Sequence, residues 1–223
     1  MIGLAVALPL SFTANAVPLG PTAYLSSADS PFSPFTGFTY FYLENFEDGL
    51  LNTPGVIASA GAPFGPTGIT DSVDADDGTI DGSGTGGNSF FSGSGAAGIS
   101  FTFSATVLGA LPNAAGIVWT DGAGTTSFEA FDAANVSLGS IGPVAIADGS
   151  ISGTTAEDRF FGITGSAGIS RIFISNTGGG IEVDHLQYGL RASPTSGVPE
   201  PASLALLGIG LAGLAAARRR KAS

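Results

Sequence analysis

Glycine divides this chain into short segments along almost its whole length. Among its 223 residues are 35 glycines, and the stretches between the Gly, Ser and Asp clusters are rich in Phe, Ile, Val and Thr. No window before Pro201 keeps the apolar period of 3.6 residues with which a helix buries one face. Short aromatic and β-branched segments bounded by turn residues are typical of strands. The chain is therefore predicted to be all-β.

In the segments 99–103, 128–131 and 171–175, residues that are expected to be buried alternate with residues that are expected to be exposed. This alternation is typical of strands with one buried face. The predicted strands are Gly37–Phe46, Gly98–Leu108, Gly116–Thr120, Ser127–Asp132, Val136–Ile141, Arg159–Thr164, Ile169–Asn176 and Ile181–Leu190. About eight to ten strands at this spacing predict a two-sheet antiparallel sandwich of jelly-roll type. The Gly-rich stretch 58–98 is predicted to be a long loop, and such loops are usually functional or mobile.

The charge of the region 17–197 is strongly one-sided. It contains all but one of the eighteen acidic residues, no lysine, and only Arg159, Arg171 and Arg191 as basic residues. A nucleic-acid-binding surface needs clustered basic residues, so this class of partner is excluded. The absence of cysteine excludes disulfides, thiol catalysis and Cys-based metal sites. An acidic body of this kind suits hard divalent cations and an extracellular location.

The C-terminal segment 198–223 has three parts, namely a Pro-Glu-Pro motif, an apolar run and a basic end. The apolar run 202–217 would form a membrane helix about 24 Å long, and residues 198–201 extend it toward the ~30 Å hydrocarbon core. The basic end consists of Arg218, Arg219, Arg220 and Lys221, which anchor the helix on the cytoplasmic side by the positive-inside rule. The alternative is a buried helix of a soluble protein.

This three-part segment resembles the PEP-CTERM sorting signal of Gram-negative bacteria that produce exopolysaccharide. The resemblance implies a membrane-embedded transpeptidase, exosortase, as partner and Pro199, Glu200 and Pro201 as the processing site. It also implies transient membrane anchoring, followed by delivery to the cell surface or the extracellular matrix.

The N-terminal segment 1–16 is apolar and ends in Ala14-Asn15-Ala16, a small-x-small pattern typical of cleavage by signal peptidase. It lacks a positive n-region, so either the natural start lies upstream or the signal is a weak one. The predicted organisation is a signal peptide at 1–16, a β-sandwich domain at 17–197 and a sorting tail at 198–223.

The body also has an order of motifs that resembles uncharacterised PEP-CTERM proteins with a β-sandwich body. The motifs are F-Y-L-E-N-F-E-D-G at 41–49, D-S-V-D-A-D-D-G-T-I-D-G at 71–82, A-G-I-V-W-T-D-G at 115–122, F-E-A-F-D-A at 128–133 and V-D-H-L-Q-Y-G at 183–189. The closing segment is similar to the last strand of galactose-binding-like carbohydrate modules. The family brings no established activity.

Two groups of carboxylates are candidate Ca²⁺ sites. The first places five carboxylates within eleven residues, at Asp71, Asp74, Asp76, Asp77 and Asp81. Ca²⁺ prefers six to eight oxygen ligands, although a solvated acidic turn explains the same pattern.

The second group combines Glu44, Glu47 and Asp48 with Glu182 and Asp184. The resemblance to carbohydrate modules implies that Glu47 and Asp184 share a structural Ca²⁺. The alternative is that Asp184 only accepts backbone hydrogen bonds at a strand end.

The function predicted for the body is non-enzymatic, as a surface or matrix protein. His185, the only histidine, is expected at a strand surface. Trp119 is expected in the core, and Phe38, Tyr40 and Tyr42 on one core-facing strand side. The first alternative is a carbohydrate-binding module for exopolysaccharide, with exposed aromatic residues beside Asp or Asn. The second is a glycan-active hydrolase or lyase, with convergent carboxylates in a deep cleft.

Overall fold

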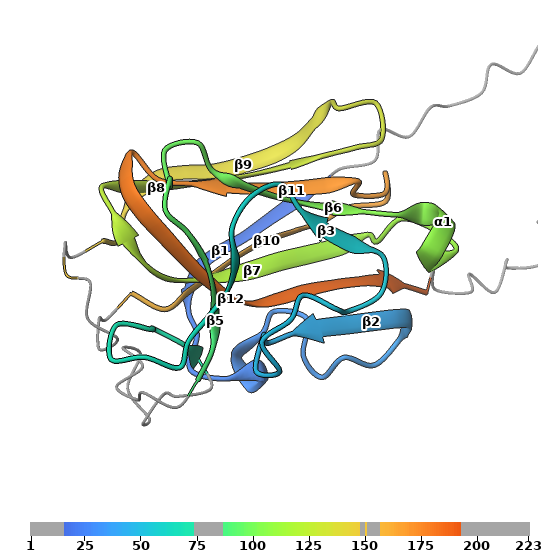
Figure 1. Cartoon of the computed structure of the whole chain (residues 1–223). Coiled ribbons are helices and arrows are strands. Elements are labelled where there is room, and N and C mark those ends of the chain that lie inside the picture. Colours follow the sequence, from blue (N-terminus) through green and yellow to red (C-terminus); the bar gives the residue numbers. More distant parts are fainter. Residues whose placement is uncertain (1–15, 74–86, 148–149, 151–156, 193–223) are drawn as a thin grey trace, which may run out of the picture. The chain divides into compact units, whose positions relative to one another are not determined.

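The computed structural model describes residues 16–73, 87–147, 150 and 157–192, and most of them lie in antiparallel strands (Figure 1). The strands are β1 (Val17–Ala23), β2 (Phe38–Glu44), β3 (Val56–Ala58), β4 (Ala62–Phe64), β5 (Ser89–Ser92), β6 (Ile99–Phe103), β7 (Ala114–Ala123), β8 (Thr125–Phe131), β9 (Ser137–Ala145), β10 (Arg159–Thr164), β11 (Arg171–Ser175) and β12 (Gly178–Arg191). Two single helical turns accompany them in the described residues, the 3₁₀ turn η1 (Ser27–Asp29) and α1 (Ala105–Leu108).

The strands form two sheets. One has the order β1-β10-β7-β12-β5-β4, with β2 also paired to β12, and the other has the order β3-β6-β11-β8-β9. From β5 to β12 the chain crosses to the other sheet at every connection except the one between β8 and β9, which are neighbours in the same sheet. This produces the strand orders 5-12-7-10 and 6-11-8-9 of a jelly roll. The all-β class and the two antiparallel sheets are confirmed, and each of the eight predicted strands overlaps an observed one.

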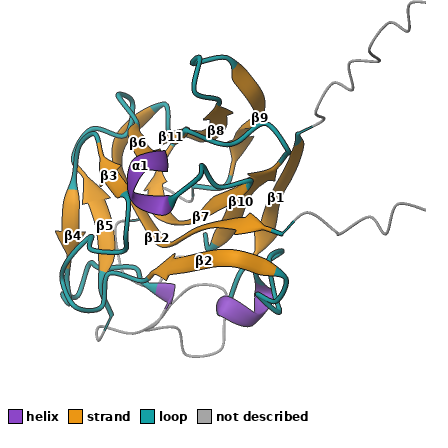
Figure 2. Ribbon diagram, turned by 90° about the vertical axis from the view of Figure 1, so that its right-hand side faces the viewer, coloured by secondary structure: helices purple, strands orange, loops and turns teal. Residues whose placement is uncertain are grey.

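The main core lies between the two sheets, which Figure 2 shows as separate layers. Ile99, Phe101 and Phe103 of β6 are buried in it, as the alternation predicted, and the same cluster contains Trp119 of β7 and Phe161 of β10. The rings of Phe103 and Tyr188 lie 4.8 Å apart across the layers. Interdigitating apolar side chains from two inner faces are what hold a β-sandwich together.

The outer face of the first sheet is also covered. The connection between β1 and β2 folds over this face, so that Tyr24 and Phe32 pack on Val118 and Phe160 in a second apolar cluster. Eight consecutive residues of β7, 114–121, are consequently buried. A strand covered on both faces needs apolar residues on both sides, which explains the continuous apolar run in the sequence.

Two predictions of strand extent were wrong. The segment 98–108 is not one strand, because β6 ends at Phe103 and the Ser104 side chain accepts a hydrogen bond from the Val107 backbone N–H at 3.4 Å, starting α1. The stretch 58–98, predicted as a loop, contains β4 and β5.

The prediction that Phe38, Tyr40 and Tyr42 of β2 all face the same core is wrong for Phe38. Tyr40 and Tyr42 pack against the main core, but Phe38 contacts Phe41 in the second cluster, with ring centroids 5.0 Å apart. The register between β2 and β12 shifts at Arg191, opposite Phe38. An extra residue in a ladder turns the side chains beyond it to the other face.

Candidate functional site

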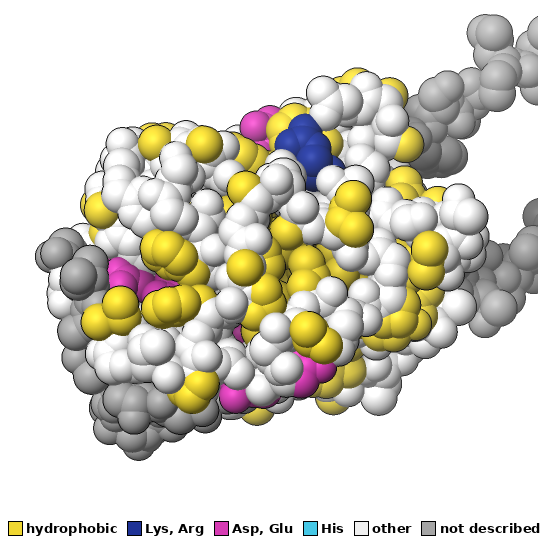
Figure 3. Space-filling view, viewed as in Figure 1, with side chains coloured by type: hydrophobic (Ala, Val, Ile, Leu, Met, Phe, Trp, Pro, Cys, Tyr) yellow, Lys and Arg dark blue, Asp and Glu magenta, His cyan; other side chains and the backbone are white. Residues whose placement is uncertain are grey.

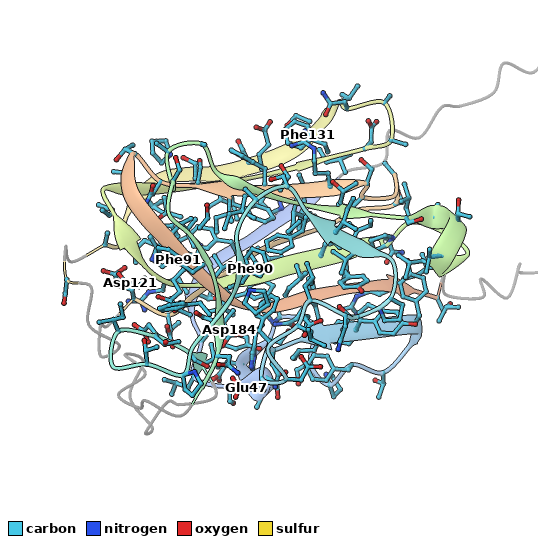
Figure 4. The ribbon with its side chains drawn as sticks, in the orientation of Figure 1. Glu47, Phe90, Phe91, Asp121, Phe131 and Asp184 are labelled. Atoms are coloured by element: carbon cyan, nitrogen blue, oxygen red, sulfur yellow. The ribbon has the colours of Figure 1, made fainter. Side chains whose placement is uncertain are left out.

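Buried carboxylates gather at one end of the first sheet, where β7, β12 and β5 meet the segment 70–73. Asp121 of β7 and Glu182 of β12 are direct Cα partners on neighbouring strands. Their exposed fractions are only 6% and 3%, and Asp71 is fully buried. Figure 4 shows Asp121 and Asp184 on this side of the molecule.

The side chain of Glu182 accepts hydrogen bonds from two buried groups of the protein. Its Oε1 accepts a hydrogen bond from the Asp71 backbone N–H at 3.1 Å and another from the Ser89 hydroxyl. Burial raises the pKa of the Glu182 carboxyl from 4.5 to about 8, and the neighbouring charges of Asp121 and Asp184 act in the same direction. The two hydrogen bonds oppose this rise but do not cancel it.

The structure brings together the pair predicted to share a metal. The Ser72 hydroxyl lies 3.1 Å from Asp184 Oδ2 and 3.5 Å from Glu47 Oε1, so that it bridges the two carboxylates. Asp184 also accepts the Val73 backbone N–H at 3.0 Å, and Glu47 accepts the Asn88 backbone N–H at 2.5 Å. Residues from three distant parts of the sequence thus meet around these two side chains (Figure 4).

The oxygen atoms of Glu47, Ser72 and Asp184 are too few to complete the coordination of a Ca²⁺ ion. Within the described ranges, no group of three or more His, Cys, Asp or Glu side chains lies close enough to hold an ion. Asp74, Asp76, Asp77 and Asp81 lie outside the described residues. Asp71, the remaining member of the predicted acidic group, lies next to Ser72 and donates its backbone N–H to Glu182.

Two acidic residues of the second predicted group have local structural roles. Glu44 accepts the backbone N–H groups of Asn52 and Thr53, each at 2.9 Å, and that of Phe46 at 3.2 Å. Asp48 accepts the Leu50 N–H at 2.9 Å. Glu44 therefore closes the turn that follows β2.

The expected surface position of His185 is wrong. The side chain is buried, and its Nδ1 lies 3.0 Å from the hydroxyl of Tyr24, which also accepts a hydrogen bond from Gln187 Nε2 at 2.9 Å. The ladder between β12 and β7 is irregular between Asp184 and Gln187, and His185 has a φ of 42°. The bulge turns the histidine beneath the connection between β1 and β2.

The predicted core position of Trp119 is confirmed, since its side chain is fully buried. Its Nε1–H donates a hydrogen bond of 3.0 Å to Glu157 Oε2. A buried indole needs a partner for this N–H group, and here a carboxylate supplies it.

A pocket of about 370 Å³ opens beside Asp121 and Glu182. Its walls are mainly apolar, with Phe64 of β4, Phe91 of β5 and Ile69 among them, and Asp121 and Glu182 contribute the acidic groups. Figure 3 shows acidic atoms flanked by apolar side chains at this end of the molecule, and Figure 4 places Phe91 next to Asp121.

Sequence reasoning missed this pocket and the pairing of Asp121 with Glu182. The paired Phe residues in N-S-F-F-S at 88–92 and the acid in W-T-D-G at 119–122 were available signals. Neither signal indicated that the two segments meet, because both reach the pocket only through pairing with β12.

The processing residues Pro199, Glu200 and Pro201 and the basic residues 218–221 lie outside the described residues. In the part of the chain that the structure describes, no helix has the length and apolar character needed to cross a membrane. The predicted membrane helix at 202–217 lies beyond that part, as do residues 1–15 of the predicted signal peptide 1–16.

Comparison with known families identifies the C-terminal segment. The profile of the PEP-CTERM protein-sorting motif matches residues 197–221. The chain carries a PEP-CTERM sorting motif. This motif implies exosortase as the processing partner and sorting to the cell surface or extracellular space of a Gram-negative bacterium. No curated protein and no solved structure matches the chain.

Proposed function

We propose that this chain is a non-enzymatic surface or extracellular-matrix protein whose β-sandwich body is delivered by its PEP-CTERM motif. The match of the sorting motif to residues 197–221 carries this proposal. The acidic, lysine-free composition of the body suits an extracellular location.

In this proposal each terminal segment has a separate role. Signal peptidase removes residues 1–16, and β1 begins at Val17, so the cut leaves the first strand intact. The helix 202–217 and the basic residues 218–221 hold the chain in the membrane until it is processed. The prolines of Pro199-Glu200-Pro201 disfavour helix and keep the recognised segment extended for exosortase.

Replacement of Glu200 by Ala tests the sorting role. In a host that contains exosortase, we expect Glu200→Ala to accumulate as a longer, membrane-retained form, because the single recognition charge is lost. Glu129→Ala changes a half-exposed carboxylate of β8 and is expected to be processed normally. The measurement is the apparent mass and fractionation of both variants on immunoblots. Normal processing of Glu200→Ala would contradict the assignment.

We further propose that Ca²⁺ stabilises the body, with Glu47 and Asp184 as two of its ligands. Carboxylate and hydroxyl oxygens are the ligands that Ca²⁺ prefers, and Ser72 already lies between the two carboxylates. Further oxygens would come from the acidic segment Asp71, Asp74, Asp76, Asp77 and Asp81. When bound, the ion would offset the repulsion among carboxylates that have no lysine in the body to neutralise them.

Calorimetric melting of the full chain in Ca²⁺ and in EGTA tests this site. A hundredfold excess of Ca²⁺ over its Kd adds about 2.7 kcal/mol to the free energy of unfolding, which corresponds to several degrees in Tm. We expect Glu47→Gln to lose most of this rise and Glu129→Gln to keep it. An equal Tm in both buffers would exclude a stabilising Ca²⁺ site.

A carbohydrate-binding role is the second candidate, and the pocket between β4, β5, β7 and β12 favours it. Its wall includes an aromatic side chain, Phe91, that is 37% exposed, and its acidic groups come from Asp121 and Glu182. Exposed aromatic residues beside Asp are what a sugar-binding groove requires. A hydrolase or lyase is less well supported, because both carboxylates are almost completely buried.

A further inference from the structure

One strand at the rim of the first sheet lacks the features that usually protect a sheet edge from other chains. This strand is β2, which pairs with β12 and with no other strand of the described residues. We propose that β2 pairs with β2 of a second copy of the chain, in an antiparallel arrangement that joins the first sheets of the two bodies. The proposal does not depend on the Ca²⁺ site or on the carbohydrate-binding role.

The position of β2 leaves one of its long edges at the rim of the sheet. Figures 1 and 2 show β2 there, next to the C-terminal half of β12. In an antiparallel ladder, every second residue directs its N–H and C=O groups away from the partner strand. Since β12 lies on one side of β2 only, these backbone groups point to the rim, where a further strand can pair with them.

The other edge strands of the two sheets carry devices that prevent such pairing. β1 contains Pro18 and Pro21, and β4 consists of three residues with Pro63 at its centre. In the second sheet, β3 has three residues and β9 contains Gly142-Pro143. Proline and short length both hinder the addition of a strand. β2 has seven residues, F-T-Y-F-Y-L-E, with no proline, glycine or lysine among them.

The side chains of β2 are only partly covered. Phe38 and residues 40–43 are half-exposed, and Thr39 is exposed. By contrast, residues 114–121 of β7 are all buried, because β7 has a strand on each side. The ladder with β12 is regular from Tyr40 to Glu44, so the irregularity near Phe38 affects one end of the edge. A strand beside β2 would therefore cover aromatic surface along most of its length.

The charges at the two ends of β2 favour a second copy in the antiparallel direction. Arg191 is exposed and lies opposite Phe38, with its guanidinium 4.6 Å from the centre of the Phe38 ring. Asp48 is exposed in the turn that follows Glu44 at the other end. A two-fold axis near Phe41 places the basic end of each strand beside the acidic end of the other. Parallel pairing would instead bring like charges together.

This complementarity matters because the body as a whole is acidic. Arg159, Arg171 and Arg191 are the only basic residues of the region 17–197, and Arg191 is the one that is exposed. Most other contacts between two such bodies would place acidic surfaces against each other, which is unfavourable. The edge of β2 beside Arg191 is where two copies can meet with opposite charges facing.

The dimer is expected to be weak. Pairing of two seven-residue strands buries less surface than the roughly 1,200 Å² of a stable interface, so we expect a Kd on the order of 100 μM. A contact of this strength forms between copies that are held close together, as on a cell surface.

Charge reversal tests the dimer in sedimentation velocity of the full chain over a concentration series. Arg191→Asp and Asp48→Arg each place like charges at both ends of the paired strands and are expected to weaken the dimer by roughly threefold to tenfold. An equimolar mixture of these two variants, and the double variant, are expected to regain the strength of the unmodified chain. Glu129→Arg, on β8 in the other sheet, is the control for the change in net charge. The C-terminal segment is identical in all variants, so any association through it is common to all.

Cysteine crosslinking tests the direction of the strands, because the chain has no cysteine of its own. With the axis at Phe41, Thr39 of one copy lies opposite Leu43 of the other, and disulfides form between Cα atoms about 4.4–6.8 Å apart. A mixture of Thr39→Cys and Leu43→Cys is therefore expected to crosslink more than either variant alone. Ser140→Cys, exposed on β9, is expected to stay uncrosslinked. The fluorescence of the buried Trp119 confirms that each variant is folded.

Three results would overturn the proposal. A chain that stays monomeric up to roughly millimolar concentration does not associate through β2. A dimer that both charge reversals leave unchanged, or that Asp48→Arg strengthens by lowering the net charge, is held by another surface. Crosslinking of Thr39→Cys to itself as readily as to Leu43→Cys would exclude the antiparallel direction. None of these results affects the sorting function.

Discussion

Glu182 is predicted to make the body less stable as the pH rises. Burial raises the pKa of its carboxyl from 4.5 to about 8, so the folded chain keeps a proton that the unfolded chain has already lost. Between these two pKa values the folded state binds more protons than the unfolded state. The free energy of unfolding therefore falls as the pH rises through this interval.

The size of this effect follows from the pKa difference. With about 1.4 kcal/mol for each pKa unit, the fall amounts to at most about 4 kcal/mol between about pH 5 and pH 9. Glu182→Gln removes the titration. The Gln carbonyl oxygen can still accept the hydrogen bonds from Ser89 and from the Asp71 backbone. The variant is expected to match the unmodified chain near pH 5 and to exceed it in stability near pH 9.

Urea unfolding in EGTA, followed by the fluorescence of Trp119, measures this difference. Trp119 is the only tryptophan and is fully buried, so its signal reports loss of the core. Glu129→Gln changes a half-exposed carboxylate and serves as the control for loss of one negative charge. If Glu182→Gln and the unmodified chain show the same dependence on pH, burial of the Glu182 carboxyl does not control stability in this range.

Three further predictions concern stability and are checked by urea unfolding followed by circular dichroism. Trp119→Phe leaves the Glu157 carboxylate without its indole donor and is expected to cost about 1–3 kcal/mol; an unchanged midpoint would contradict this role of the hydrogen bond. Gly116→Ala places a Cβ atom within 2.7 Å of the Phe161 carbonyl and is expected to cost about 1–3 kcal/mol, whereas Gly178→Ala, with no atom within 4 Å of its Cβ, is expected to be nearly neutral. Glu44→Gln weakens the closure of the turn after β2 and is expected to cost about 1–3 kcal/mol, more than Asp48→Asn; equal costs would argue against this role.

Three of the eight predicted strands have a clear local pattern in the sequence. β6, β8 and β11 alternate between buried residues and half-exposed or exposed residues, and this period of two is visible in the sequence without any knowledge of their partners. The strands that were missed are short or contain proline. β3 and β4 have three residues each, and β1 contains Pro18 and Pro21. Their strand conformation comes from pairing with a neighbouring strand that is distant in the sequence or follows a turn.

The candidate sites show the same division between local and long-range information. Glu47 and Asp184 were paired through a resemblance, and the structure brings them to either side of Ser72. The pairing of Asp121 with Glu182 and the burial of His185 depend on the register and the bulges of β12 against β7. Register is decided by contacts between segments far apart in the sequence, so no local pattern predicted these positions.

By itself, the sequence determined the all-β class, the inward faces of the clearly alternating strands and the PEP-CTERM motif. These properties depend only on residue type and on spacing along a few neighbouring positions. The tertiary structure alone decided which carboxylates are buried together, which aromatic side chains stay exposed and where a pocket opens. The physical reason is that burial and charge repulsion depend on distances in space, which strand order and register set once the two sheets have packed.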